Sequence, residues 1–253
     1  MKKLVRAVFS RVSSMLPASW LESWIELMAR ARVSSLPPDE ALRFLFRVDA
    51  TLYRLEGKGS VRYGKGIHTK HRHTRYHDFF VERVGKGERV LDVGCGHGAL
   101  AYDIADRAGA SVVGIDLDPR NIEKARERFA HKRIEYREGD ASKDLQGERF
   151  DVVILSNVLE HLGGRPAFLA RVLALAEPAR VLIRVPSFER DWRVPLKQEL
   201  GVEWRLDPTH ETEYTMESFE RELEEGGLHI VDRNVCWGEI WAETIPAALR
   251  EEF

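Results

Sequence analysis

The stretch that decides the fold is Val90-Leu91-Asp92-Val93-Gly94-Cys95-Gly96-His97-Gly98, a short apolar strand that runs into three glycines at alternate positions. Glycine permits a tight turn and lets a ligand approach the backbone where a Cβ would collide. In open α/β sheets, ligands bind at the carboxyl ends of the strands. The stretch therefore predicts a strand, a ligand-binding turn and a helix that begins after Gly98.

The glycine spacing and Asp92 indicate which ligand the turn binds. A dinucleotide-binding loop has the spacing GxGxxG, whereas this loop has GxGxG with Asp92 two residues before the first glycine. A carboxylate at that position repels a diphosphate and attracts an ammonium group. We therefore expect an amino-acid nucleoside here, and a dinucleotide oxidoreductase is the least favoured interpretation.

Strands and helices alternate along the chain from residue 88 onward. The pattern is typical of a mostly parallel sheet covered by helices on both faces. Residues 228–245 suit a closing antiparallel hairpin, and an acidic helix is expected at 216–226. The other expected strands are 89–94, 111–116, 133–140, 150–157 and 180–186, and the other expected helices are 99–109, 119–131 and 165–177.

Polar residues stand where the predicted strands end. Asp116 can accept both hydroxyls of a ribose, and Asp118 could share that role. Asp140 would accept a hydrogen bond from the exocyclic amine of an adenine, and Ala141 would offer its backbone N–H. Asn157 ends the next strand, on the rim where the reacting centre of the ligand is expected.

The motifs VLDVGCGHG, VVGID, EGDA and FDVVILSNVLEHL, in this order and spacing, resemble those of class I S-adenosylmethionine-dependent methyltransferases of the small-molecule type. The resemblance covers roughly residues 80–185. It implies a Rossmann-like, doubly wound α/β fold with a seven-stranded, mostly parallel sheet whose last strand is antiparallel. It also implies S-adenosylmethionine as cofactor. The cofactor-binding residues that we predict are Asp92, Gly94, Gly96, Gly98, Asp116, Asp118, Asp140, Ala141 and Asn157.

His161 and His210 are the candidate catalytic residues. His161 follows the fourth strand, and its ordinary pKa suits a general base for an oxygen acceptor. The alternative for His161 is a structural turn in which it bonds to the backbone. Glu160 either orients the histidine or faces solvent. His210 lies in the insertion 186–215, which forms either an acceptor-pocket wall with Trp192 and Trp204 or a solvated polar loop whose tryptophans belong to the core.

We predict no metal. In ubiquinone-type O-methyltransferases the segment corresponding to residues 156–162 resembles SEVLEHL, with both glutamates and the histidine near a divalent ion. Asn157 replaces the first of these glutamates, which removes one charged ligand from a site for a hard cation.

The region before the first strand is expected to be mainly helical, and we divide the chain into a helical cap or extension over 1–79 and a Rossmann-like domain over 80–253. Apolar residues have helical spacing up to Pro17, a second apolar piece follows, and a helix is predicted over 40–56. A further short helix is expected at 76–84. Basic residues near Trp20 and Trp24 also suit a peripheral membrane anchor, although a cap over the cofactor site is the favoured interpretation.

Residues 57–77 form a basic segment, and we expect residues 57–75 to be a loop. It is either a solvated loop or a lid that contacts an anionic group of the acceptor. RNA binding is less favoured because the formal net charge of the chain is −2. The segment contains Lys58, Arg62, Lys65, Lys70, Arg72 and Arg75, and His68, His71, His73 and His77.

Length and composition fit this interpretation. The 253 residues allow one generous domain with an appended cap, and the two cysteines cannot form a disulfide framework, which favours a cytoplasmic setting. We expect a methyltransferase that acts on an oxygen of a small polar or anionic acceptor. The alternatives are an RNA or protein methyltransferase and a non-catalytic cofactor-binding scaffold. Ser156-Asn157-Val158-Leu159 argues against base methylation, for which Asn/Asp-Pro-Pro-Tyr is frequent at this position.

Overall fold

The computed structural model describes residues 11–145 and 147–252. The chain divides into two compact units. The first unit comprises Met1–Gly66 and Leu196–Val202, and the second comprises Ile67–Pro195 and Glu203–Phe253. The boundary expected near residue 79 stays a prediction.

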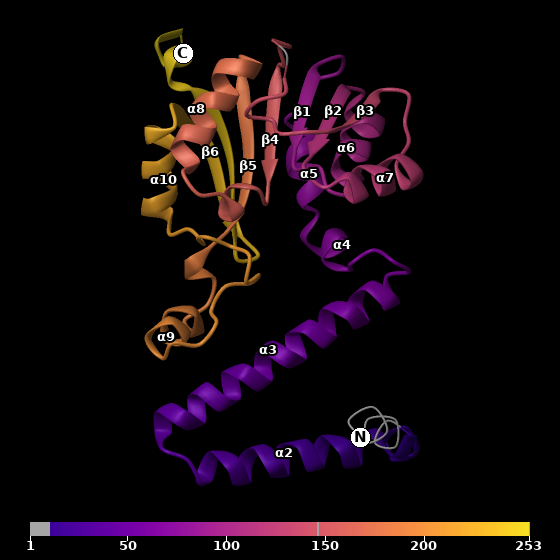
Figure 1. The fold of residues 1–253 in the computed structure, drawn as a ribbon, viewed down its shortest axis with the longest axis vertical. Helices are drawn as coiled ribbons and strands as arrows, with labels where there is room; N and C mark the ends of the chain where they lie inside the picture. The colour runs from indigo at the N-terminus through magenta and orange to yellow at the C-terminus, as the bar shows by residue number, and fades with distance from the viewer. Residues whose placement is uncertain (1–10, 146, 253) are drawn as a thin grey trace. The chain divides into compact units, whose positions relative to one another are not determined.

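The second unit contains one seven-stranded sheet in the order β3-β2-β1-β4-β5-β7-β6 (Figure 1). Strands β1 to β5 are parallel to their neighbours, whereas β7 is antiparallel to both β5 and β6. The predicted fold class, including the antiparallel last strand, is confirmed. The strands are β1 Arg89–Val93, β2 Ser111–Asp116, β3 Ile134–Glu138, β4 Val152–Ser156, β5 Arg180–Pro186, β6 Leu228–Cys236 and β7 Glu239–Pro246.

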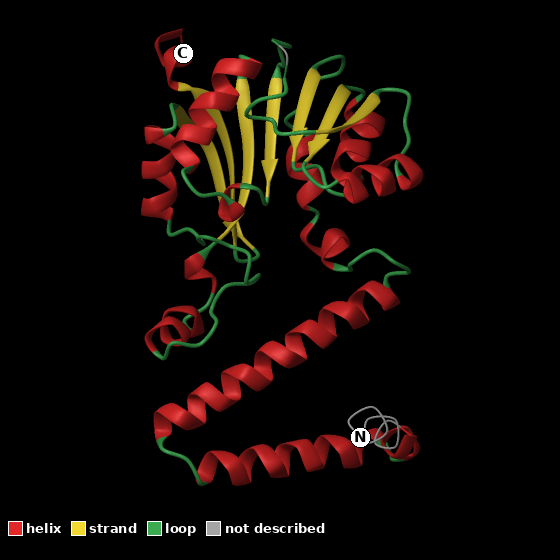
Figure 2. Ribbon diagram, in the orientation of Figure 1, coloured by secondary structure: helices red, strands yellow, loops and turns green. Residues whose placement is uncertain are grey.

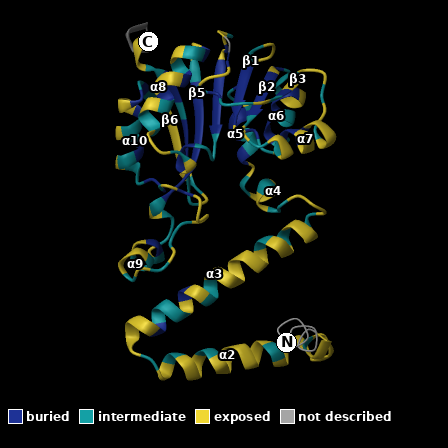
Figure 3. Cartoon of the chain, viewed as in Figure 1, coloured by how far each residue is buried: buried dark blue, intermediate teal, exposed yellow. Residues whose placement is uncertain are grey.

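Helices cover both faces of this sheet because the side chains of each central strand alternate between two apolar cores (Figure 2). Leu91 and Val93 face the core that includes α8 (Arg165–Ala176) and α10 (Met216–Glu225), whereas Val90 faces the other core. The second core includes α5 (Tyr76–Val81), α6 (Ala99–Asp103) and α7 (Pro119–Arg128). The central strands are therefore buried throughout (Figure 3).

Local signals set the ends of several elements. The acidic helix begins at a cap, since Thr215 and Ser218 form a reciprocal capping box at the start of α10. Trp237 and Gly238 connect β6 to β7 with positive φ angles of 55° and 76°, as a tight two-residue hairpin requires. The helix expected at 99–109 is α-helical only to Asp103 and continues as a π-helical turn over Ile104–Ala108.

The first unit contains α2 (Ala18–Ser34) and α3 (Pro38–Tyr63), each of which begins after a proline at its N-cap. None of the residues of α2 is buried. Within this unit, Arg43 Nε donates to the Leu200 carbonyl at 2.9 Å and Lys197 Nζ to Asp49 at 3.3 Å. The first part of the predicted N-terminal helix, over residues 1–10, lies outside the described residues.

The expectation of a loop over 57–75 is wrong at both ends. Helix α3 continues to Tyr63, because Gly57 and Gly59 cost it only about 1 kcal/mol each and no proline interrupts it. The helix ends where Lys65 and Gly66 adopt positive φ angles. A short helix, α4 (Lys70–Thr74), follows in the second unit, and α9 (Arg193–Glu199) lies in the insertion.

Candidate functional site

A pocket of about 490 Å³ lies at the carboxyl ends of β1 to β4. Because these strands are parallel, residues that are far apart in sequence meet at this edge of the sheet. Asp92, Gly98, Asp118 and His210 are not among the lining residues. The predicted residues that line the pocket are Gly94, Gly96, Asp116, Asp140, Ala141, Asn157 and His161.

Two buried oxygen atoms at this edge lack hydrogen-bond partners. Asp92 is only 2% exposed, and its Oδ2 has no partner; the same holds for Oδ1 of Asn157, which follows β4 with a φ of 57°. Burial, together with the charge of Asp116, raises the pKa of Asp92 to about 7. An unpaired buried acceptor is costly, and an ammonium group would satisfy both oxygens. These residues therefore fit the amino-acid end of S-adenosylmethionine.

Asp116 organises the glycine turn. Its Oδ2 accepts from the Gly96 backbone N–H at 2.9 Å, and its Oδ1 accepts from the Asp118 backbone N–H at 2.8 Å and from Asn121 Nδ2 at 3.2 Å. Oδ1 thus uses both of its lone-pair directions, whereas Oδ2 keeps one. The carboxylate can therefore hold the loop and still accept one hydroxyl donor from a ribose.

The glycines of the turn, Gly94, Gly96 and Gly98, are required for different physical reasons. All three adopt positive φ angles, between 55° and 84°. A Cβ on Gly96 would meet no protein atom within 4 Å, so the space beside it is open to a ligand. A Cβ on Gly98 would instead collide with the hydroxyl of Tyr136, which donates to the Gly98 carbonyl at 3.2 Å. Gly98 therefore serves the packing of the turn on β3, outside the pocket lining.

Asp118, which follows β2, and Asp140, which follows β3, differ in their placement. Asp118 caps α7, where Oδ1 accepts from the Arg120 backbone N–H at 2.9 Å, and its carboxylate also pairs with the Arg120 guanidinium. Asp140 lines the pocket while Oδ1 accepts from Ser142 and Oδ2 from Lys143. The bond from Lys143, and then those from Ser142, lower the pKa of Asp140, so it stays an ionised acceptor.

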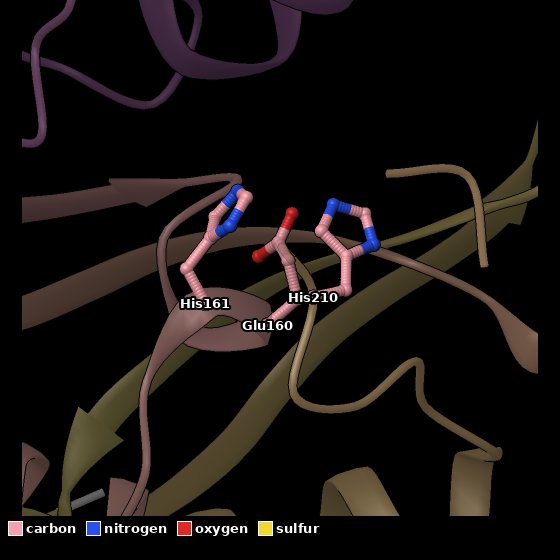
Figure 4. A group of neighbouring side chains, drawn as sticks. All are labelled: Glu160, His161 and His210. Carbon is pink, nitrogen blue, oxygen red and sulfur yellow. The ribbon is translucent and has the colours of Figure 1, made fainter. Parts of the chain in front are cut away.

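Glu160, His161 and His210 meet beside this pocket (Figure 4). One ligand atom from each of the three lies within 4.8 Å of the others, and the two imidazole rings pack edge-on with their centroids 4.7 Å apart. Glu160 is fully buried, and neither of its carboxylate oxygens has a hydrogen-bond partner. Burial raises the pKa of Glu160 to about 7 and lowers the pKa of His161, which the charge of His210 lowers further. The alternative that Glu160 faces solvent is wrong.

Backbone bonds fix the insertion against Glu160. The carbonyl oxygen of Glu160 accepts from the backbone N–H of Glu211 at 2.7 Å and of Thr212 at 3.3 Å. His210 is therefore held at a position 49 residues away in sequence from His161, and it is buried. The alternative of a solvated polar loop is therefore wrong for His210, although residues 206–209 and Glu211 beside it are exposed.

The carboxylate of Glu213 bonds several residues of the insertion. Its side chain is completely buried, and its carboxylate pairs with Arg190 and accepts from the Leu206 backbone N–H. It also bonds Nδ1 of His210 at 2.9 Å. Sequence reasoning missed this residue because a glutamate in a polar run carries no signal of burial.

The two tryptophans of the insertion lie in different surroundings. Trp192 is exposed, so it is not a core residue, and Trp204 packs edge-on against Phe188; neither lines the pocket.

Lys70 lies near Arg184, Glu239 and Glu160, whose charges act on its ammonium. Burial lowers the pKa of Lys70, and the charge of Arg184 lowers it further.

Further pocket-lining residues were not predicted. They are mostly backbone or apolar neighbours of the predicted acids, and they include Leu117, Asn121, Gly139, Ser142, Val158, Leu162 and Phe168. Leu117 exposes its side chain beside Asp116, although apolar side chains of this size are usually buried. An apolar residue directly after a strand-ending acid is the signal that would have found it.

Two negative observations apply to the described part of the chain. A second hollow, of about 520 Å³ along α10 and β6, gathers none of the predicted site residues. Across residues 11–145 and 147–252, we find no helix whose length and apolarity would let it cross a bilayer.

Comparison with known proteins gives a family match and a set of relatives. A family model described as "Methyltransferase domain" matches residues 67–233, more than half of the chain. A ubiquinone biosynthesis O-methyltransferase of Rhodopseudomonas palustris (strain BisB5) is 33% identical over 156 residues, which cover 58% of this chain and 61% of the relative. The same enzyme of Azorhizobium caulinodans is 41% identical over 110 residues, 42% of this chain and 43% of the relative. The matches thus span less than two thirds of these relatives.

Solved structures share the fold. Magnesium protoporphyrin IX methyltransferase from Synechocystis PCC 6803, with bound SAH, has a TM-score of 0.55 at 20% identity and covers 69% of this chain and 83% of its own. A SAM-dependent methyltransferase from Aquifex aeolicus has a TM-score of 0.55 at 18% identity and covers 67% of this chain and 89% of its own.

Proposed function

Because the chain belongs to the methyltransferase domain family and is a S-adenosylmethionine-dependent methyltransferase, we propose that it methylates an oxygen atom of a small polar or anionic acceptor. One observation carries the proposal. The pocket that fits the donor adjoins a cluster of two imidazoles and a buried, unpaired carboxylate, which can take a proton from a hydroxyl.

The residues at the strand ends would hold the donor. We assign the ammonium to Asp92 and Asn157, the ribose to Asp116, and the adenine to Asp140, Ala141 and the apolar Leu117. When bound, S-adenosylmethionine supplies a methyl group that its sulfonium already activates. The chain therefore needs only to align the acceptor, exclude water and accept the acceptor's proton.

The cluster Glu160–His161–His210 would act on the acceptor oxygen. His161 lines the pocket, so it is the member that reaches an acceptor there. Thr209 Oγ1 donates to Asp207 at 2.8 Å, and it therefore accepts from Nδ1–H of His161 at 3.1 Å. That tautomer leaves Nε2 of His161 with a free lone pair for the reaction.

The acceptor's charge is inferred from its surroundings. Lys70 and Arg184 are the cations near Glu160, and Arg184 is held by a bidentate pair with Glu239 and lies 3.8 Å over the Tyr76 ring. Lys70 has no such pair in the described contacts. This ammonium without a carboxylate partner supports an acceptor with an anionic or strongly polar group. The oxygen-directed chemistry of the ubiquinone biosynthesis relatives agrees with the proposed atom.

A screen with a labelled methyl donor tests this function. Incubated with whole-cell extract, the wild-type protein should transfer the label to a small, polar or anionic product. His161→Ala should slow that transfer about 100-fold or more while leaving donor affinity unchanged. Label in RNA or protein would favour the macromolecular alternative, and donor binding without transfer to any acceptor would favour the scaffold alternative.

We also propose that the helical unit binds anionic membrane surfaces. Residues 1–66 carry twelve Lys/Arg and six Asp/Glu, although the whole chain is slightly acidic. Trp20, Trp24 and Met28 follow one another at four-residue spacing on α2, and each is about 60% exposed. Indoles beside basic residues suit the headgroup region of a bilayer.

Vesicle sedimentation tests this contact. We expect the intact protein to bind vesicles that contain phosphatidylglycerol and to lose most of that binding at high salt. Trp24→Glu should weaken binding about 10-fold, whereas Trp192→Glu, the same change at an exposed tryptophan of the second unit, should not. No binding of the intact protein at low salt would contradict the proposal.

A further inference from the structure

We propose that Lys70 and His71, the first two residues of α4, bind a carboxylate group of the acceptor, so that the substrate is a hydroxylated carboxylic acid. The inference rests on the proposed function for the methyl transfer, but binding of the carboxylate can be measured without any transfer. It narrows the acceptor from any small polar or anionic molecule to one chemical class.

The start of α4 is linked by direct contacts to the end of β4. Helix α4 lies on the side of the sheet where the parallel strands end (Figure 1). The Tyr76 hydroxyl lies 3.1 Å from Nδ1 of His71, and the Arg184 guanidinium lies 3.8 Å over the Tyr76 ring. Arg184 is in register with Ser156, the last residue of β4, and the next residue, Asn157, lines the donor pocket. A ligand on α4 would therefore lie next to this pocket.

The charges at this point leave one cation without a counterion. The Arg184 guanidinium is compensated by its bidentate pair with Glu239. His71 is neutral at pH 7, because burial, and then the charge of His77, lower its pKa to about 4. In the described part of the chain, no carboxylate lies within ion-pair distance of the Lys70 ammonium. The single excess charge matches a carboxylate better than a doubly charged phosphate.

The neutral His71 can supply a hydrogen-bond donor beside this ammonium. When the Tyr76 hydroxyl donates to Nδ1 of His71, the ring proton is on Nε2. An Nε2–H can then donate to one carboxylate oxygen while Lys70 binds the other. Two different donors, one of them charged, suit the two oxygens of a carboxylate.

Lys70 lies on the acceptor side of the site. The charge of Glu160, the neighbour of His161, acts on Lys70. The charge of Asp92, which we assign to the donor's ammonium, acts instead on Tyr76. The donor's own carboxylate is attached to the same carbon as its ammonium, so we expect it near Asp92. An acceptor whose carboxylate is bound by Lys70 can present its hydroxyl to His161, which lines the pocket.

The turn between α4 and α5 fixes His71 before a ligand arrives. Arg75 adopts a φ of 52°, which is strained for a residue other than glycine, and its side chain pairs with Asp78 at 2.6 Å. Nδ1 of His77 bonds Asp103 at 2.7 Å, and the His77 ring packs edge-on against His71. A site held in place in this way loses little entropy when it binds.

Calorimetric titration with benzoate tests the inference on the full-length protein. Saturating S-adenosylhomocysteine is present, so that the donor pocket is filled. Benzoate should bind at least about 10-fold more tightly than benzamide, which has the same shape without the charge. Lys70→Met should weaken benzoate binding about 10-fold and leave benzamide binding and donor affinity within about 2-fold of wild type. Lys86→Met, at an exposed lysine before β1 and thus at the opposite ends of the strands, should change none of these affinities.

Four results would overturn the inference. They are no saturable benzoate binding by the wild type, equal affinities for benzoate and benzamide, unchanged benzoate binding in Lys70→Met, and tighter binding of phenyl phosphate than of benzoate. A loss of donor affinity in Lys70→Met would assign Lys70 to the donor's carboxylate and would overturn it as well. All of these results leave the proposed function standing, since the extract screen tests methyl transfer separately.

Discussion

Asp92→Asn is expected to weaken binding of S-adenosylmethionine by about 100-fold and to make the ligand-free protein more stable at pH 8. The loss of affinity follows because the amide removes the charge that a charge-assisted bond to the ammonium requires. Isothermal titration calorimetry measures it. Asp106→Asn, a matched change at an exposed aspartate, should alter neither quantity.

The gain in stability follows from the pKa of Asp92. Its value in the folded protein, about 7, lies above the ordinary value of 3.8, because burial, and then Asp116, oppose ionisation. The Asp92 carboxyl group therefore ionises at a lower pH in the unfolded chain than in the folded protein. The free energy of unfolding consequently falls as pH rises from about 4 to about 7 and then levels off. Above pH 7 the variant should be more stable than the wild type by an amount on the order of 4 kcal/mol, and this difference should vanish near pH 4.

The same group makes donor binding depend on pH. The ammonium pairs with the ionised carboxylate, so affinity should rise as pH increases toward about 7 and should then level off. Below pH 7 the binding should release a proton, which calorimetry in buffers of different ionisation enthalpy detects. Wild-type affinity in Asp92→Asn, or a pH-independent donor affinity, would contradict the assignment.

Glu213→Ala is expected to lower the free energy of unfolding by about 3–5 kcal/mol and to abolish methyl transfer. The variant leaves Arg190 without its buried partner and His210 without the acceptor that orients it. The donor pocket is built by other elements, so donor affinity should stay within about 2-fold of wild type. Chemical denaturation and donor titration measure the two effects.

Glu211→Ala is the control for this prediction. Glu211 is exposed, and it contacts Glu160 through its backbone, which the substitution keeps. Its free energy of unfolding should stay within about 0.5 kcal/mol of wild type. Equal losses in both variants would show that the insertion tolerates no change at all and that Glu213 has no special role.

The strands of the sheet were predictable because their signals are local. β1, β2 and β5 lie within a residue of their predicted bounds, since each is a short apolar run closed by a polar residue or glycine. Parallel topology then brings Asp116, Asp140 and Asn157 to one edge, and the structure places all three in one pocket.

The cluster of Glu160, His161 and His210 could be predicted only in part because its geometry depends on contacts between residues far apart in sequence. Nothing in residues 203–215 reveals that two backbone N–H groups would bind the Glu160 carbonyl. These two bonds hold His210, which is buried, beside His161. The extent of α3 was missed for a different reason, since its glycines resemble a loop although each costs a helix only about 1 kcal/mol.

The two bonds to the Glu160 carbonyl are only part of what holds the insertion, and this limits how the chain can diverge. Upstream of them, Thr209 Oγ1 bonds Nδ1 of His161 at 3.1 Å, and the Asp207 carbonyl accepts from the His210 backbone N–H at 3.0 Å. We therefore expect descendants to exchange one acceptor for another by substitutions in residues 203–209 that keep these bonds. A graft of this segment should retain Asp207 and Thr209.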